Sequence, residues 1–383
     1  MSTINVDIIN PETGTKVTVN QVEISQPIVG TGTAPFRNTI IGTGAGASLT
    51  TGPTSTSGTM NVVLGIDAMR LQTFGSQNTI IGEKAMELTS DPVQACVAVG
   101  VGALGLGVMT SGTLGQTAIG TGALMSVVSG MAGDPAYPLL TFTQNTALGL
   151  GAGQNLLSGG NNIFIGAGSG GTLTSGIGNT VIGSEFNASS ITATGNYNTF
   201  VGASKPRDFA GGNNNTYIGS QNWTVLLTPL SETGNNNILV GSNVTKATPS
   251  ASNSITLGNS SNTVLRCAVT SITSLSDARD KKEIEELPVG LEFVEKLKPV
   301  KFTWEDRNEE GKHDVEDFGF IAQDLKASQE EVNASYLGLV YEANPEKLEA
   351  SYGKLLPVLV KAIQELSSEV KSLKEELETL KTK

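Results

Sequence analysis

Two patterns of apolar positions divide this chain. Between residues 30 and 275 a short phrase recurs, in which Asn and a small residue precede two apolar residues and a Gly. Near the C-terminus, apolar residues instead recur at alternating steps of three and four. The first pattern is too short for a helix and favours three-residue strands, whereas the second is one face of a long helix. The pattern therefore predicts a repetitive β region followed by a helical one.

The glycine phrase returns often enough to define a repeat. It reads NTIIG, NVVLG, NTALG, NIFIG, NTVIG, NTFVG, NTYIG, NILVG or SITLG, with two versions that lose the Asn, CVAVG and QTAIG. A step of 17 residues recurs between the closing glycines, and the longer steps indicate loops inserted into a fixed coil. Fixed-period similarity predicts stacked coils that bury apolar faces against one another. The closing residues are Gly42, Gly65, Gly82, Gly100, Gly120, Gly149, Gly166, Gly183, Gly202, Gly219, Gly241 and Gly258.

Asn and Gly have separate roles in this expectation. Asn tolerates left-handed backbone and suits the turn before each strand, and stacked Asn side chains would bond from coil to coil. Gly allows a bend or a close backbone approach. The alternative is a disordered Gly/Ser/Thr-rich linker, and the regular apolar pairs argue against it. Residues 1–29 lie outside the repeat, and alternation in TKVTVNQVEIS predicts strands there.

The short forms TAIGTGAL, VAVGVGAL and TALGLGAG resemble the repeats of trimeric adhesin heads, which are left-handed parallel β-rolls. The spacing here is longer and looser, so the resemblance carries over the style of fold only. It implies an all-β, elongated region of the trimeric parallel β-helix or β-roll type.

The C-terminal pattern predicts a parallel coiled coil over residues 352–383. With its first apolar residue at heptad position a, Leu occupies every d position. Glu369 and Glu376 then fall at g, five residues before Lys374 and Lys381 at e, the offset that pairs parallel helices. One amphipathic helix packed on its own domain is the alternative. Because branched a residues with Leu at d favour dimers, the seam leaves dimer or trimer open. Its members are Leu356, Leu359, Ile363, Leu366, Val370, Leu373, Leu377 and Leu380.

Charge changes abruptly at Ser276. Residues 1–275 hold 8 Lys+Arg and 11 Asp+Glu, a net of −3, whereas residues 276–383 hold 16 and 25, a net of −9. Between the boundary and the seam, the segment up to Trp304 predicts a short helix, a proline-marked break and a strand. FGFIA, residues 318–322, predicts a strand that runs into a helix. The chain is therefore expected to have two differently built regions, the second a compact α+β unit.

The totals narrow the function classes. A pI near 4.7 argues against a nucleic-acid binder. Cys96 and Cys267 are far apart and lack metal-type spacing, so neither a metal site nor a cofactor is expected. The first residues show no basic and apolar leader, and no apolar run is long enough to insert into a membrane. We expect a soluble protein made in a cytosol.

Four motifs after the boundary carry a resemblance to a known family. SDARDKKEI, LKPVKFTW, FGFIAQDL and YGKLLPVLVKAIQEL, in that order, resemble the intramolecular chaperone auto-processing domain of endosialidase-type phage tail spikes and fibres. Its signature, Ser-Asp-x-Arg-x-Lys, is kept at Ser276, Asp277, Arg279 and Lys281. The resemblance implies a domain that trimerises, guides folding of the β region before it, and then cuts itself off.

The same resemblance implies a Ser–Lys dyad that acts once in cis. Ser276 would be the nucleophile and Lys281 the general base, and the cut would fall beside Ser276, at Leu275–Ser276 or Ser276–Asp277. Five residues of helix rotate by about 500°, which leaves the two side chains about 140° apart. We therefore expect an extended or capping segment that folds back on Lys281. The alternative is that Ser276 merely caps a helix.

Together these expectations describe a phage fibre or spike found on the virion and assembled in the host cytoplasm. Residues 1–29 would attach it to tail or capsid proteins, residues 30–275 would form the shaft that contacts a host surface glycan or protein, and residues 276–383 would be the chaperone of a homotrimer. The alternatives are a glycan depolymerase, a trimeric bacterial surface adhesin, and a fibre whose cap is never cut.

Overall fold

The computed structural model forms two compact units, divided after residue 178. The predicted segment 1–29 and most of the longest insertion, MSVVSGMAGDPAYPLLTFTQ, lie outside the described residues. No helix among the described residues is long and apolar enough to cross a bilayer. The structure describes residues 38–49, 58–88, 93–105, 115–126, 144–171, 173–184, 194–202, 211–220, 233–262, 264–268, 272–305 and 313–382.

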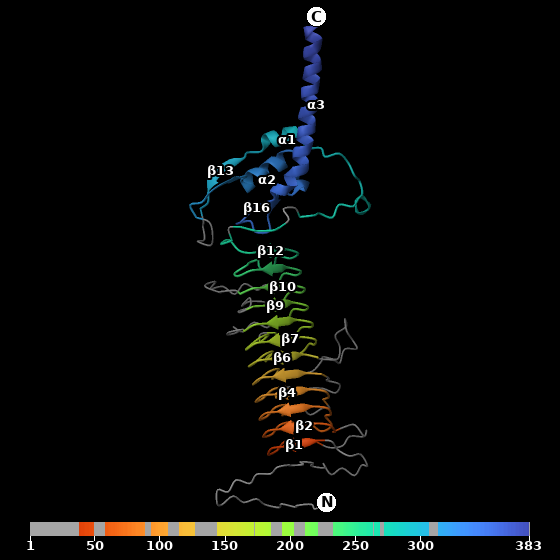
Figure 1. Cartoon of the computed structure of the whole chain (residues 1–383), viewed down its shortest axis with the longest axis vertical. Coiled ribbons are helices and arrows are strands. Elements are labelled where there is room, and N and C mark those ends of the chain that lie inside the picture. Colours follow the sequence, from red (N-terminus) through yellow and green to blue (C-terminus); the bar gives the residue numbers. More distant parts are fainter. Residues whose placement is uncertain are drawn as a thin grey trace, which may run out of the picture. The chain divides into compact units, whose positions relative to one another are not determined.

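The repeat region is a parallel β-solenoid, as predicted, and each of its strands ends directly before a glycine of the repeat. Within each unit, neighbouring strands pair in parallel and in register (Figure 1). The first unit holds β1 (Thr39–Ile41), β2 (Val62–Leu64), β3 (Thr79–Ile81), β4 (Val97–Val99), β5 (Thr117–Ile119), β6 (Thr146–Leu148) and β7 (Ile163–Ile165). The second holds β8 (Thr180–Ile182), β9 (Thr199–Val201), β10 (Thr216–Ile218), β11 (Ile238–Val240) and β12 (Ile255–Leu257).

The middle residue of each three-residue strand points into the solenoid, because successive side chains of a strand alternate between its faces. Ala118 of β5 is fully buried, and so is Leu124 from the turn that follows it. In β7 the strand carries the large side chain instead, Phe164, and the two turn positions against it are Gly153 and Gly170. A Cβ on Gly153 would lie 2.7 Å from the ring. Volume is thus exchanged between strand and turn at constant packing.

Buried asparagines stack from coil to coil, as the sequence predicted. The side-chain oxygen of Asn198 accepts hydrogen bonds from the backbone N–H and the side-chain amide of Asn215, each at 3.0 Å. Asn215 does the same for Asn237, and its own amide donates to the Gly234 carbonyl at 2.9 Å. Cys96 stands in this ladder without a side-chain amide, although its backbone N–H still donates to the Asn78 oxygen. The ladder satisfies backbone groups that the coil would otherwise bury unpaired.

The prediction that these asparagines adopt the left-handed conformation is wrong. The left-handed residue is the one before the ladder position: Asn214 has φ +59°, Asn236 +55° and Tyr197 +55°. Among the described residues, no ladder asparagine has a positive φ. In the pair Asn214-Asn215, the first residue therefore makes the turn and the second makes the ladder.

This division predicts that the same substitution has very different effects on stability at two adjacent positions. Asn215→Gly removes the ladder bonds and leaves the Asn237 N–H and the Gly234 carbonyl buried without that partner, which lowers the free energy of unfolding by about 3 kcal/mol. Asn214→Gly keeps a left-handed backbone that glycine adopts freely, so it changes stability by about 0.5 kcal/mol or less. Chemical denaturation of both variants measures the difference, and equal losses would contradict the assignment.

The C-terminal part of the second unit is the small α+β fold that the sequence predicted. Its elements, apart from short 3-10 turns, are α1 (Leu291–Lys296), β13 (Val300–Thr303), β14 (Glu316–Gly319), α2 (Ala322–Glu331), β15 (Val340–Tyr341), β16 (Glu349–Ala350) and α3 (Leu355–Lys381). The core joins α1, α2 and α3, with Phe293, Leu325 and Val358 almost fully buried.

Both predicted strands of this fold are present, each ending earlier than predicted. β13 ends at Thr303, directly before Trp304. β14 spans EDFG rather than FGFIA, because its antiparallel pairing runs from Thr303↔Glu316 to Val300↔Gly319. The strand pairing therefore ends where β13 begins, and the two residues after Gly319 lead into α2.

Candidate functional site

The structure brings Ser276 and Lys281 together. Residues 272–277 have no regular structure, and a short 3-10 turn, Ala278–Asp280, reverses the chain before Lys281. Lys281 Nζ lies 2.5 Å from Ser276 Oγ and 3.2 Å from the Ser276 carbonyl oxygen. The serine hydroxyl thus lies within hydrogen-bonding reach of an amine that can accept its proton when neutral.

The other signature residues build the turn between them. Asp277, not Ser276, is the N-cap of the turn, and its carboxylate accepts from the Arg279 backbone N–H at 2.9 Å. The Arg279 guanidinium also donates to this carboxylate at 2.6 Å and 3.0 Å. Bonding to the Arg279 side chain first, and then to its backbone, holds the pKa of Asp277 below its usual value. The Asp277–Arg279 pair stabilises this reversal of the chain, called the hairpin below (residues 272–286), and neutralises the guanidinium charge.

The whole hairpin is exposed to solvent in the single chain. Every residue from 272 to 286 is exposed, and Ile272 and Leu275 show 99% and 101% of their surface. A Ser–Lys pair needs a neutral amine as its base, and burial is what favours that form. The single chain therefore supplies the geometry of a Ser–Lys pair without the burial that would activate it.

Helix α3 uses two different faces. Leu355, Val358 and Ala362 are buried and pack its first turns on the domain core, so the first turns do pack on their own domain, but through this other face. All eight seam residues are exposed, with Leu356 at 65%, Leu373 at 63% and Leu380 at 68%. Beyond these first turns, the apolar stripe is open to solvent in the part of the chain that the structure describes.

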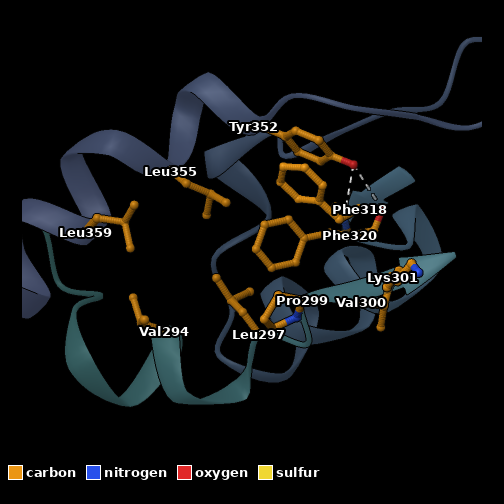
Figure 2. Close-up of a pocket in the computed structure, with 11 residues that line it drawn as sticks. Val294, Leu297, Pro299, Val300, Lys301, Phe318, Phe320, Tyr352, Leu355 and Leu359 are labelled. Carbon is orange, nitrogen blue, oxygen red and sulfur yellow. Dashed lines mark hydrogen bonds between the residues drawn. The ribbon is translucent and has the colours of Figure 1, made fainter. Parts of the chain in front are cut away.

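An apolar pocket of about 680 Å³ opens at the base of this seam (Figure 2). α3 contributes Leu355 and the seam residue Leu359, and α1, the β13–β14 pair and the segments next to them supply the rest, including the 82%-exposed Phe318. The Tyr352 hydroxyl closes one side by donating to the Phe320 carbonyl and accepting from its N–H. Its lining is Val294, Leu297, Pro299, Val300, Lys301, Phe318, Gly319, Phe320, Tyr352, Leu355 and Leu359. The exposed apolar surface of the seam thus continues onto the domain.

The described part of the solenoid offers few side chains that could take part in catalysis. Glu87 accepts from Arg70 at 2.7 Å, and Asp67 lies 3.7 Å from the same guanidinium, so these carboxylates are engaged in an ion-pair cluster. The described residues hold no cluster of three or more His, Cys, Asp or Glu arranged as metal ligands. Cys96 is buried, which raises the pKa of its thiol to about 12.

Comparison with known proteins identifies one segment of the chain. The family model described as chaperone of endosialidase matches residues 276–333. Searches of curated proteins and of solved structures gave no match. The match begins at Ser276, where the charge pattern changes, and includes the hairpin, α1, the β13–β14 pair and α2. It ends before α3, so the fourth motif of the sequence resemblance lies outside it.

Sequence reasoning missed the pocket. The predicted strand FGFIA holds both Phe318 and Phe320 and places both rings on the same face. The structure ends that strand at Gly319, so Phe318 lies in the strand and Phe320 lies after it, and both line the pocket with Tyr352. Three closely spaced aromatic and apolar segments in an otherwise charged region were the available signal.

Proposed function

We propose that this chain is a subunit of a phage tail or capsid fibre, and that its C-terminal region assembles three copies and then cuts itself off beside Ser276. The observation that carries the proposal is the 2.5 Å contact between Lys281 Nζ and Ser276 Oγ inside the chaperone segment. Residues 1–29 would join the virion, and the solenoid would meet a host surface glycan or protein through its inserted loops.

The proposed cleavage is an acyl transfer followed by hydrolysis. Neutral Lys281 takes the proton of Ser276 Oγ, which bonds to the carbonyl carbon of Leu275; the C–N bond of the Leu275–Ser276 peptide breaks, and the ammonium returns a proton to the leaving amine. Water then hydrolyses the ester, leaving a carboxylate on Leu275 and the Ser276 hydroxyl restored. This route passes through a five-membered ring, whereas attack by Ser276 on its own carbonyl needs a four-membered one. Leu275–Ser276 is therefore the expected bond.

Assembly would supply the missing burial. The hairpin is exposed in one chain, while the seam and the pocket present apolar surface for other copies. When the copies come together, exposed apolar residues such as Leu275 become covered, and a lysine near them loses water and favours its neutral form. Cleavage would thus report a completed trimer, and the released shaft would be held by the slow unfolding of its stacked coils.

The test compares two substitutions on α3. Leu366→Glu places a charge in the seam, so we expect mainly monomers by native mass and cleavage at least about tenfold slower, since burying an unpaired charge is costly. Ser368→Glu puts the same charge on an exposed position outside the seam and should behave as the natural chain. Denatured mass follows fragments of 275 and 108 residues.

Two results would contradict the proposal. Equal cleavage rates for Leu366→Glu and the natural chain would show that the seam does not control the cut. An uncut natural chain in a stable trimer would make the C-terminal region a permanent cap.

A further inference from the structure

An aliphatic column runs along the outer face of the solenoid sheet in each unit. The third residue of every strand, the one before the glycine, is Ile, Leu or Val. In the first unit these residues are Ile41, Leu64, Ile81, Val99, Ile119, Leu148 and Ile165. In the second unit they are Ile182, Val201, Ile218, Val240 and Leu257.

These side chains point away from the buried middle residue and are incompletely covered. Leu148 is 46% exposed, Ile41 46% and Ile218 45%, and none of the twelve is buried. The first residue of each strand shares this face and is Thr, Val or Ile, so no charged residue occurs on any of the twelve strands. Soluble monomers seldom expose a continuous apolar strip of this kind.

We infer that this column is the surface along which solenoids of neighbouring copies of the chain pack, side by side and in parallel register. The inference rests on the proposed function, which supplies the copies, and names the surface that joins their shafts. Identical columns would meet around a common axis, each aliphatic residue against its counterparts at the same height.

The repeat distance selects a second copy as the partner. Parallel strands place one column residue about every 4.8 Å. A surface with this period is matched at every step by an identical column, as in packed sheets of identical segments. A sugar chain suits it poorly, because aliphatic side chains leave buried hydroxyl groups without hydrogen-bond partners.

The position of the insertions supports the same partner. The long steps of the repeat all fall between strands, and the column residue is followed directly by its glycine in every coil. Inserted loops therefore leave the strand face uninterrupted. The charges of α3 favour copies that run parallel, since Glu369 and Glu376 lie five residues before Lys374 and Lys381, the offset of parallel helices.

Two leucines of one coil provide a matched test. Leu148 lies in the column with 46% exposure, and Leu157 lies outside the strands with 48%. Each is replaced by Cys in the full chain carrying Cys267→Ser, and a short bismaleimide is added. Cys96 stays unreactive, because burial raises the pKa of its thiol to about 12. Leu373→Cys, in the α3 seam, reports on helix association independently.

We expect Leu148→Cys and Leu373→Cys to yield linked dimers on a denaturing gel, and Leu157→Cys at least tenfold less. If Leu148→Cys links no better than Leu157→Cys while Leu373→Cys links fully, the column is not the interface and the proposed function stands. Linking at Leu148 without linking at Leu373 supports the column and contradicts helix-led assembly. Absence of linking at both positions overturns the column as well.

Discussion

Alanine at Ser276 or at Lys281 is expected to leave every chain at its full 383 residues, while the natural chain splits in two. Ser276→Ala removes the attacking oxygen, and Lys281→Ala removes the group that lies 2.5 Å from it. Among the described residues, no other amine forms a hydrogen bond to Ser276. Because each group is needed for bond breaking, either loss should stop the reaction altogether.

The matched control is the next lysine along the chain. Lys282 is exposed and lies 3.9 Å from Glu283, so Lys282→Ala should cut as the natural chain does. Lys281→Arg keeps the positive charge but not a usable base, because a guanidinium stays protonated. Intact denatured mass of this variant then distinguishes a role of Lys281 as the base from a role as a structural cation. Cutting by Lys281→Arg at the natural rate would exclude the proposed base, and fragments ending at residue 276 would move the cut to the following bond.

Gly100→Ala should strongly destabilise the solenoid. Gly100 has φ +134°, and a Cβ there would lie 2.6 Å from the backbone carbonyl of Gly120 in the next coil. The strand beyond cannot retreat without breaking the ladder, so we expect a loss of about 4 kcal/mol or more from the free energy of unfolding. Apparent melting temperature and yield of folded chain measure the loss.

Gly102 is the control for the cost of a left-handed backbone without a clash between coils. It lies in the same turn with φ +64°, and a Cβ there meets nothing within 4 Å. Gly102→Ala should therefore show only the left-handed penalty of about 1–2 kcal/mol. If the two variants lose equal stability, close approach between coils is not what requires the glycine.

The repeat was readable in the sequence because one local cause acts in every coil. At Gly100 and Gly120 a Cβ would meet the backbone of the next coil, so glycine marks the strand end even where the ladder residue is Cys96 or Gln116. The stacking of asparagines followed from the same periodicity. Which of two adjacent asparagines turns left-handed did not, because that depends on how the preceding loop enters the coil. The strand register of the C-terminal fold was displaced for a similar reason: Gly319 is set by its partner Val300.

At the candidate site, spacing predicted the geometry in part. Five residues cannot place Ser276 and Lys281 on one helical face, and the structure joins them through a tight reversal instead. The Asp277–Arg279 pair that closes this reversal was seen only as a fixed part of the motif. Solvent exposure of the hairpin was not predictable from the sequence, since it depends on how residues 272–286 leave the domain surface.

The packing of Phe164 against glycines limits how the coils of the solenoid can be exchanged. In most coils the strand and the turn of the same coil fill the interior, and each coil contacts only its neighbours. Whole coils can therefore be added or deleted, and the length of the solenoid can change in steps of one coil. The ring of Phe164 instead requires Gly153 from the preceding coil. A splice between these two coils that replaced Gly153 by a leucine, as at Leu124, would force the ring out of the core. Natural or engineered variants of the shaft should therefore exchange these two coils together.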